Sequence, residues 1–296
     1  MLYYDKIKKT EVLMQTYEEK ITETLSSLER INEQNRNYFN RHTVLVPSRK
    51  EIVKLVKRMQ AIMFPDYFSL DEDDGATREE IAKRLLSALK LQLTAAYSFN
   101  DEDSVVDTEK IAFELFGLLP EIKEMLMSDI EALYEGDPAA RSPEEVILSY
   151  PGFYAISIYR IAHEFYLRGV PYISRIMTEF AHEKTGIDIH AGATVGDHFF
   201  IDHGTGIVIG ETTTIGSRVK IYQGVTLGAK SFELDENGNP VKGIKRHPDI
   251  GDDCIIYANA TILGGNTRIG SGSVIGGNVW LTHSVDPGST VYYNAK

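Results

Sequence analysis

Residues 187–228 have the sequence IDIHAGATVGDHFFIDHGTGIVIGETTTIGSRVKIYQGVTLG, in which an aliphatic residue recurs every six positions. The series begins at Ile189, Val195, Ile201 and Ile207, and after a shift of two residues it continues at Ile209, Ile215, Ile221 and Leu227. Glycine often follows the aliphatic residue, which suits a short strand that ends in a tight turn. Three such units would form one triangular coil, and stacked coils would bury an aliphatic column.

The same period returns after an interruption at residues 229–246. It resumes at Ile250, Ile256 and Ile262, and after a shift of one residue it ends with Leu263, Ile269, Ile275 and Leu281. The alternative, an ordinary sheet that happens to alternate, does not account for so many aliphatic residues in frame. The pattern therefore predicts a hexapeptide-repeat β-helix, although the spacing alone does not give its hand.

The residues before Gly186 have a helical pattern instead. Three capping boxes mark helix starts, and apolar residues follow each other at helical spacing, as in Leu13, Tyr17, Ile21 and Leu25. The boxes are Ser48 with Glu51, Thr77 with Glu80, and Ser142 with Glu145. We therefore expect an α+β chain: an all-α N-terminal domain over residues 1–186 and a β-helix domain over residues 187–296.

Composition narrows the classes of function. The chain has 296 residues and a formal net charge of −12, which argues against general nucleic-acid binding because that relies on basic residues. No apolar run reaches the length of about 18 residues that a membrane helix needs. The single cysteine, Cys254, cannot form an intrachain disulfide, and with the absence of a signal peptide it favours a cytoplasmic protein.

The interruption at residues 229–246, which we call the arm, is long for a compact domain, and such loops often carry function. It contains four basic residues in an acidic protein: Lys230, Lys242, Lys245 and Arg246. We interpret it as an excursion that reaches a neighbouring coil or subunit and helps to hold an anionic ligand. A disordered insertion is the alternative.

Several motifs in this order resemble those of the serine O-acetyltransferases. They are Asp188-Ile-His190, the stretch from Phe199 to Glu211, the stretch from Tyr222 to Gly228, and Lys245-Arg-His-Pro248. Upstream, Asp137-Pro138 and the stretch from Gly152 to His163 resemble the helical segment that precedes the family's β-helix. The resemblance covers roughly residues 128–285. It implies a left-handed β-helix and acetyl transfer from acetyl-CoA to the hydroxyl of L-serine, the first step of cysteine biosynthesis.

The resemblance also assigns roles to single residues. His203 corresponds to the family's general base, and Asp188 to the carboxylate that orients its imidazole. Without the motif, His203 would be taken for a structural histidine at a coil corner. Arg246 and His247 correspond to the pair that binds the substrate carboxylate, whereas Asp202 and Asp137 correspond to the acidic positions that meet its amino group and hydroxyl. Asp137 alone could equally cap a turn before Pro138.

Acetyl-CoA is the co-substrate that the resemblance implies, and it would lie in a groove between neighbouring β-helices. Gly228, Ala229 and Ala258 correspond to positions where the backbone approaches the pantetheine arm. From their charge we add Lys230 and Lys242 as candidates for its phosphates. We expect no metal, since the histidines show no convincing ligand spacing.

Because the groove needs a neighbour, we expect a homo-oligomer, either a trimer or a dimer of trimers. Residues 291–296 lack the isoleucine-ending tail with which many relatives bind the downstream enzyme, O-acetylserine sulfhydrylase (cysteine synthase), so a complex with it is doubtful. Two other functions stay open. One is acetyl transfer to another acceptor, such as homoserine, a sugar or a xenobiotic. The other is a β-helix that serves only as a scaffold or holds zinc.

Overall fold

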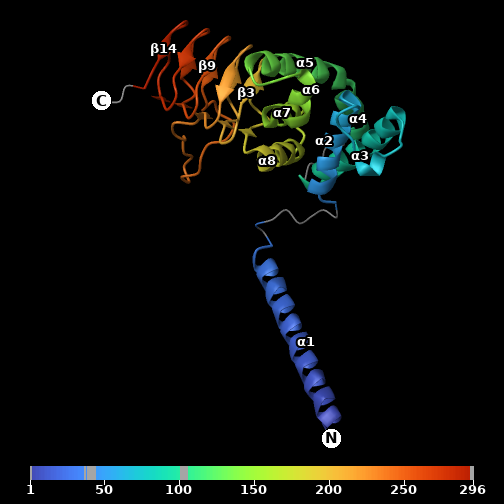
Figure 1. The fold of residues 1–296 in the computed structure, drawn as a ribbon. Coiled ribbons are helices and arrows are strands. Elements are labelled where there is room, and N and C mark those ends of the chain that lie inside the picture. The colour runs from blue at the N-terminus through green and yellow to red at the C-terminus, as the bar shows by residue number, and fades with distance from the viewer. Residues whose placement is uncertain (1, 37, 39–44, 101–105, 294–296) are drawn as a thin grey trace.

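The computed structural model describes residues 2–36, 38, 45–100 and 106–293, and at the N-terminus it describes side chains only for Met14 and from Thr16 onward. Helices come first and short parallel strands follow (Figure 1). The helices are α1 (Leu2–Gln34), α2 (Arg49–Met63), η1 (Asp71–Asp73), α3 (Arg78–Phe99), α4 (Thr108–Gly117), α5 (Leu119–Gly136), α6 (Pro143–Ser149), α7 (Pro151–Leu167) and α8 (Ile173–Thr185).

The predicted helix starts at Ser48, Thr77 and Ser142 are all N-caps in the structure. Only Thr77 forms the full reciprocal box with Glu80. The other two are half-formed because their backbone or side-chain groups have other partners. The Ser48 amide donates to Gln92 Oε1 at 2.8 Å, and Glu145 Oε2 accepts from the Arg141 amide at 2.8 Å.

The strands form a parallel β-helix, in which each coil contributes one short strand to each of three sheets, except that the last coil gives none to sheet B. Sheet A has the order β1-β4-β7-β10-β13, sheet B the order β11-β8-β5-β2, and sheet C the order β14-β12-β9-β6-β3. The strands are β1 (Asp188–Ile189), β2 (Thr194–Val195), β3 (Phe200–Asp202), β4 (Val208–Ile209), β5 (Thr214–Ile215), β6 (Lys220–Tyr222), β7 (Thr226–Gly228), β8 (Asp249–Ile250), β9 (Ile255–Ile256), β10 (Thr261–Leu263), β11 (Arg268–Ile269), β12 (Val274–Ile275), β13 (Trp280–Leu281) and β14 (Thr290–Val291).

The predicted aliphatic column is buried, and the register places its members directly above one another. Ile189 pairs with Ile209, Ile209 with Leu227, and Leu227 with Ile262. Leu263 is the exception, because it is only half-buried and lies opposite Gly228. The shift of frame therefore falls between Ile262 and Ile269, and the column does not pass through Leu263.

The apolar stripe predicted in the first helix is not part of this core. Helix α1 forms as the spacing predicts, yet Tyr17, Ile21 and Leu25 are 64%, 59% and 55% exposed. The side chain of Leu13 lies outside the described part of the molecule. Helical periodicity thus identified an apolar face here without identifying what covers it.

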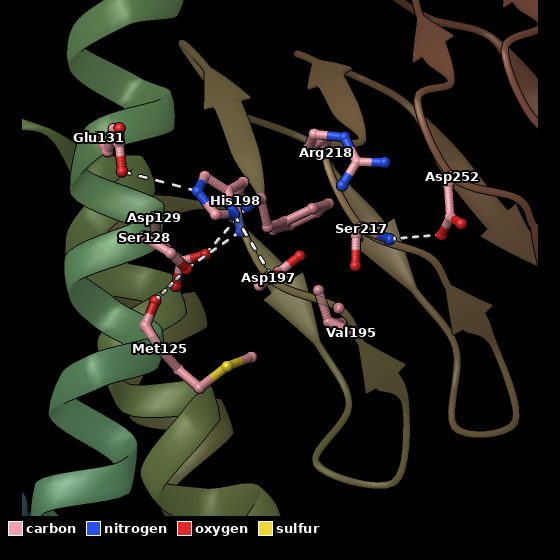
Figure 2. A network of polar contacts seen from close by, with 12 residues as sticks. Met125, Ser128, Asp129, Glu131, Val195, Asp197, His198, Ser217, Arg218 and Asp252 are labelled. Carbon is pink, nitrogen blue, oxygen red and sulfur yellow. Dashed lines mark hydrogen bonds and ion pairs between the residues drawn. The ribbon is translucent and has the colours of Figure 1, made fainter.

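A buried ion pair joins the helical part to the first coil, and Figure 2 shows one of its partners, Asp129, beside Ser128 and His198. Arg160 of α7 donates to both carboxylate oxygens of Asp129 of α5, at 2.6 and 2.7 Å. The same guanidinium donates to the carbonyls of Val195 and Gly196, and Asp129 accepts from the Phe199 amide at 2.9 Å. Because Asp129 lies in the middle of α5 and Phe199 directly precedes β3, this network fixes α5 against the chain that leads into β3.

Candidate active site

His203 lies at the corner that joins β3 of sheet C to β4 of sheet A. We call residues 202–206 the histidine corner. His203 itself has a left-handed backbone, with φ of 55°, and its side chain is 73% exposed, so the imidazole points away from the core. Gly204 follows with φ of 83°, and a Cβ there would overlap the Ile187 side chain. The corner is thus a strained, closely packed turn that holds an exposed imidazole.

Two carboxylates belong to this corner. Asp202 Oδ1 lies 3.6 Å from His203 Nδ1. Asp188 opens β1 directly beneath, since its amide donates to the Ile207 carbonyl at 2.9 Å and the Gly206 amide donates to the Gly186 carbonyl at 2.8 Å. Among the described residues, however, no hydrogen bond or ion pair joins Asp188 to His203. The predicted pairing of Asp188 with His203 stays a prediction.

Asp137 reaches the same corner from the helical part. It follows α5, and its Oδ2 accepts from the Tyr150 hydroxyl at 2.6 Å while Oδ1 accepts from the Ala139 amide at 2.8 Å. These two hydrogen bonds, helped by the charge of His203, hold the pKa of Asp137 below its usual value. The same hydrogen bond raises the pKa of Tyr150 to about 12. The Asp137 carboxylate is therefore a fixed anion near the imidazole.

Arg246 and His247 lie at a different corner, between sheets A and B. We call residues 210–212 and 245–247 the arginine corner. Arg246 Nη2 donates to Glu211 Oε2 at 2.5 Å, and Glu211 also accepts from the Tyr166 hydroxyl at 2.9 Å. Burial raises the pKa of Glu211, but the hydrogen bonds from Arg246 and Tyr166 outweigh it, and the net shift is downward.

His247 is 7% exposed and neutral at pH 7. Burial, helped by the charge of Arg246, lowers its pKa to about 4. Its Nδ1 accepts from the Thr212 amide at 3.0 Å, so the proton of the neutral ring is on Nε2. Arg246 can therefore offer a substrate carboxylate a positive charge, and His247 can offer a neutral N–H donor.

The two corners are separate edges of one triangular prism. His203 and Asp202 lie between sheets C and A, and Arg246 and Glu211 lie between sheets A and B. Within the described chain no hydrogen bond or ion pair links one corner to the other. The structure thus brings Asp137, Asp202 and His203 together and places Arg246 and His247 elsewhere.

The residues expected to line the cofactor groove divide in the same way. Gly228 ends β7 and Ala229 follows it at the edge between sheets A and B, whereas Ala258 follows β9 at the edge between sheets C and A. Lys230 lines a cavity of about 270 Å³ together with Lys245 and Arg246. The exposed Lys242 is not among the residues that line it.

The arm between β7 and β8 is a small hairpin. Leu234 forms an antiparallel bridge with Pro240, and Asp235 Oδ1 accepts from the Asn237 and Asn239 amides at 2.9 Å. At its base Lys245 Nζ donates to the Thr212 carbonyl of the neighbouring coil at 2.5 Å. The disordered insertion is therefore the wrong alternative.

The sequence reasoning missed two residues that hold site groups in place. Tyr150 orients Asp137, and Thr212 orients His247 and accepts from the Arg246 amide at 3.0 Å. Tyr150 precedes Pro151, which fixes an extended backbone there, but nothing in the sequence indicates where the phenol points. Thr212 offered no signal beyond its place next to Glu211.

The described residues contain neither a cluster of metal-binding side chains nor a helix that could span a membrane. Among their side chains, no group of three or more His, Cys, Asp or Glu residues could hold a metal ion. Within the same residues, no helix combines the length and the apolar character needed to cross a membrane.

Comparison with known proteins decides the family. A family model described as the N-terminal region of serine acetyltransferase matches residues 80–157. A serine acetyltransferase from Synechococcus elongatus is 45% identical over 264 residues, which cover 83% of this chain and 81% of that protein. The chain belongs to the serine acetyltransferase family. A Bacillus subtilis member is 48% identical over 167 residues, covering 56% of this chain and 72% of its own length.

Solved structures agree with the fold. Serine acetyltransferase isoform 3 of Entamoeba histolytica, in complex with cysteine, is 40% identical with a TM-score of 0.70, over 82% of this chain and 81% of that one. Serine acetyltransferase 1 of the same organism, in complex with L-cysteine, is 41% identical with a TM-score of 0.69, over 80% and 86%. The predicted order of a helical region and then a β-helix is confirmed.

Proposed function

We propose that this chain transfers the acetyl group of acetyl-CoA to the hydroxyl of L-serine, giving O-acetyl-L-serine and CoA. The observation that carries the proposal is the histidine corner, where an exposed imidazole lies beside Asp202 and close to the fixed anion of Asp137. Family membership and the relatives solved with cysteine support serine as the acceptor, since cysteine differs from serine only in its side-chain atom.

His203 is the base in this proposal. Its imidazole takes the proton of the serine hydroxyl while the oxygen attacks the thioester carbonyl, and the tetrahedral intermediate collapses with release of the CoA sulfur. The imidazolium then returns the proton to that sulfur. Asp202 or Asp188 stabilises the protonated ring, and the wide spacing of 3.6 Å to Asp202 fits a contact that tightens when substrate is bound.

The remaining residues bind the zwitterion of serine. Asp137 and Asp202 attract the ammonium group, while Arg246 and the Nε2–H of His247 hold the carboxylate. These two sets lie on different edges of one chain. We therefore propose a trimer, or a dimer of trimers, in which the histidine corner of one copy faces the arginine corner of its neighbour.

Acetyl-CoA would lie in the groove between the same two copies. Ala258 on one edge and Gly228 with Ala229 on the other would leave room for the pantetheine arm, and Lys230 with Lys242 would neutralise its phosphates. In this proposal the reaction is the first step of cysteine biosynthesis. The proposal also includes a cytoplasmic location, which rests on the single, buried Cys254.

Acetyl transfer is tested by following loss of the thioester with L-serine, L-homoserine or a sugar as acceptor. We expect turnover to be selective for serine and to fall roughly 10²–10⁴-fold in His203→Ala. His182→Ala, which removes an exposed histidine of α8, is the control and should keep full activity. Equal rates in wild type and His203→Ala would remove His203 from the mechanism. Turnover only with another acceptor would overturn the assignment of L-serine as the substrate.

A further inference from the structure

Helix α1 carries an apolar stripe that its own chain leaves uncovered. Six large apolar side chains in its described part are each 51–64% exposed: Met14, Tyr17, Ile21, Leu25, Leu28 and Ile31. Figure 1 shows α1 apart from the other helices. Helices in proteins gain most of their stability by packing an apolar face, so we expect a helix of 33 residues with such an exposed face to have a partner.

The spacing of the stripe is that of a coiled coil. Met14, Ile21 and Leu28 repeat every seven residues and occupy the a positions of a heptad. Tyr17 and Ile31 occupy d positions, and the d position between them holds the polar residue Thr24. A strict seven-residue repeat keeps one seam facing a like helix along its length, which favours another α1 as the partner.

The symmetry of the proposed trimer sets the direction of the helices. A threefold axis relates the copies by rotation alone, so three α1 helices that pack around it run parallel. In this arrangement Lys20 at a g position faces Leu25 at an e position of the neighbouring helix.

The same seam disfavours two strands and favours a higher number. Leu28 at an a position is followed by Ile31 at a d position, and this combination disfavours two-stranded coils. Leu25 at an e position widens the apolar face beyond the narrow seam of a dimer.

We propose that α1 forms a parallel three-stranded coiled coil with the α1 helices of two other copies of this chain. The inference rests on the trimer proposed above, which supplies three parallel copies. The coiled coil joins the subunits through a segment that precedes the region matched by the family model. It adds a contact between subunits that lies outside both corners of the site.

Cysteine substitution in the full-length protein tests the coiled coil. Ile21→Cys and Leu28→Cys place a thiol in the seam, and Thr22→Cys and Glu29→Cys, each one residue further along, place it on the outer face. On mild oxidation we expect disulfide-linked pairs in both seam variants, up to about two thirds of the chains because three strands leave one thiol unpaired. The outer-face variants and the parent protein, whose Cys254 is buried, should cross-link little.

Other results would overturn the inference. Cross-linking at only one seam position would indicate antiparallel helices, and nearly complete cross-linking at both would indicate two strands. A trimeric mass by light scattering with no seam cross-links would overturn the coiled coil alone. A monomeric mass would overturn it together with the proposed trimer. Acetyl transfer to L-serine, measured on the reduced variants, tests the proposed reaction separately.

Discussion

Tyr150 donates to Asp137 Oδ2 at 2.6 Å, and together with the Ala139 amide it fixes the orientation of the Asp137 carboxylate. A carboxylate that rotated freely would bind an ammonium group less tightly. A hydrogen bond to a charged group contributes about 1.5–3 kcal/mol to the stability of the arrangement that contains it. In the proposed site this hydrogen bond serves to orient the Asp137 carboxylate, because Asp137 is ionised at pH 7 with or without the phenol.

Tyr150→Phe should therefore raise the KM for L-serine about tenfold, since a carboxylate free to rotate binds the ammonium group less well. The KM for acetyl-CoA should stay unchanged. Steady-state kinetics with each substrate varied in turn measures both. Tyr134→Phe, which alters an exposed tyrosine of α5, is the matched control. An unchanged KM for serine would contradict a positioning role for Tyr150.

His247 makes the folded state sensitive to acid. Its pKa is about 4 in the folded chain and about 6.5 when unfolded, so the unfolded state binds the proton first as the pH falls. Its contribution is fully present above pH 6.5 and is lost progressively toward pH 4, by about 2.5 kcal/mol at pH 4.5.

His247→Asn should remove this loss, because the amide oxygen of asparagine can accept from the Thr212 amide but does not titrate. Urea unfolding at pH 7 and pH 4.5 gives the comparison. Wild type should lose about 2.5 kcal/mol more than the variant between the two pH values, while losses from carboxylates are common to both. Equal losses would mean that His247 is not held neutral.

At the scale of elements, the Asp129–Arg160 pair joins α5, α7 and the loop before β3. Both side chains are almost fully buried, at 0% and 6% exposure. Removing one partner leaves an uncompensated charge in the interior, and such changes destabilise strongly. Since α5 also leads to Asp137, the network links the stability of the junction to the shape of the proposed site.

Asp129→Ala should lower the free energy of unfolding by about 3–5 kcal/mol, because Arg160 would keep its charge without a partner. Glu183→Gln removes the exposed pair with Arg49 and should cost less than about 1 kcal/mol. Urea unfolding followed by circular dichroism measures both. Similar losses in the two variants would show that the buried pair does not hold the junction.

Local sequence patterns predicted the helix starts and the β-helix strands well, because contacts within one chain determine these elements. The period of six located the strands from β1 to β13, because inward aliphatic residues are buried by the neighbouring coils, but the series ended at Leu281 and missed β14. Ser48 and Ser142 were found as N-caps, but their boxes were only half-formed because Gln92 and the Arg141 amide compete for the same groups. Such competitors lie far away in sequence or depend on loop geometry, and no short motif records them.

At the scale of the whole molecule, two faces of this chain would be completed by other copies in the proposed assembly. The stripe of α1 was predicted as a helix face but its exposure was not, because periodicity does not say what covers a face. The motifs predict that His203 and Arg246 serve one site, yet the fold puts the two residues on different edges of the chain. A linear pattern cannot show which chain each residue of a shared site comes from.

Mixed oligomers test whether the site is shared. His203→Ala and Arg246→Ala should each be almost inactive alone, because every site lacks either its base or its carboxylate-binding cation. Equal amounts of the two variants are unfolded together and refolded. In the mixture a site is intact if its histidine corner comes from the Arg246→Ala chain and its arginine corner comes from the His203→Ala chain. Random assembly gives about one quarter of such sites.

We therefore expect recovery of up to about one quarter of wild-type activity in the mixture. Each variant refolded by itself controls for refolding, and wild type refolded alongside gives the yield. If both corners served one site within a single chain, every chain in the mixture would still carry one defect, and activity would stay at the level of the single variants. Recovery thus requires that neighbouring copies complete each other's sites.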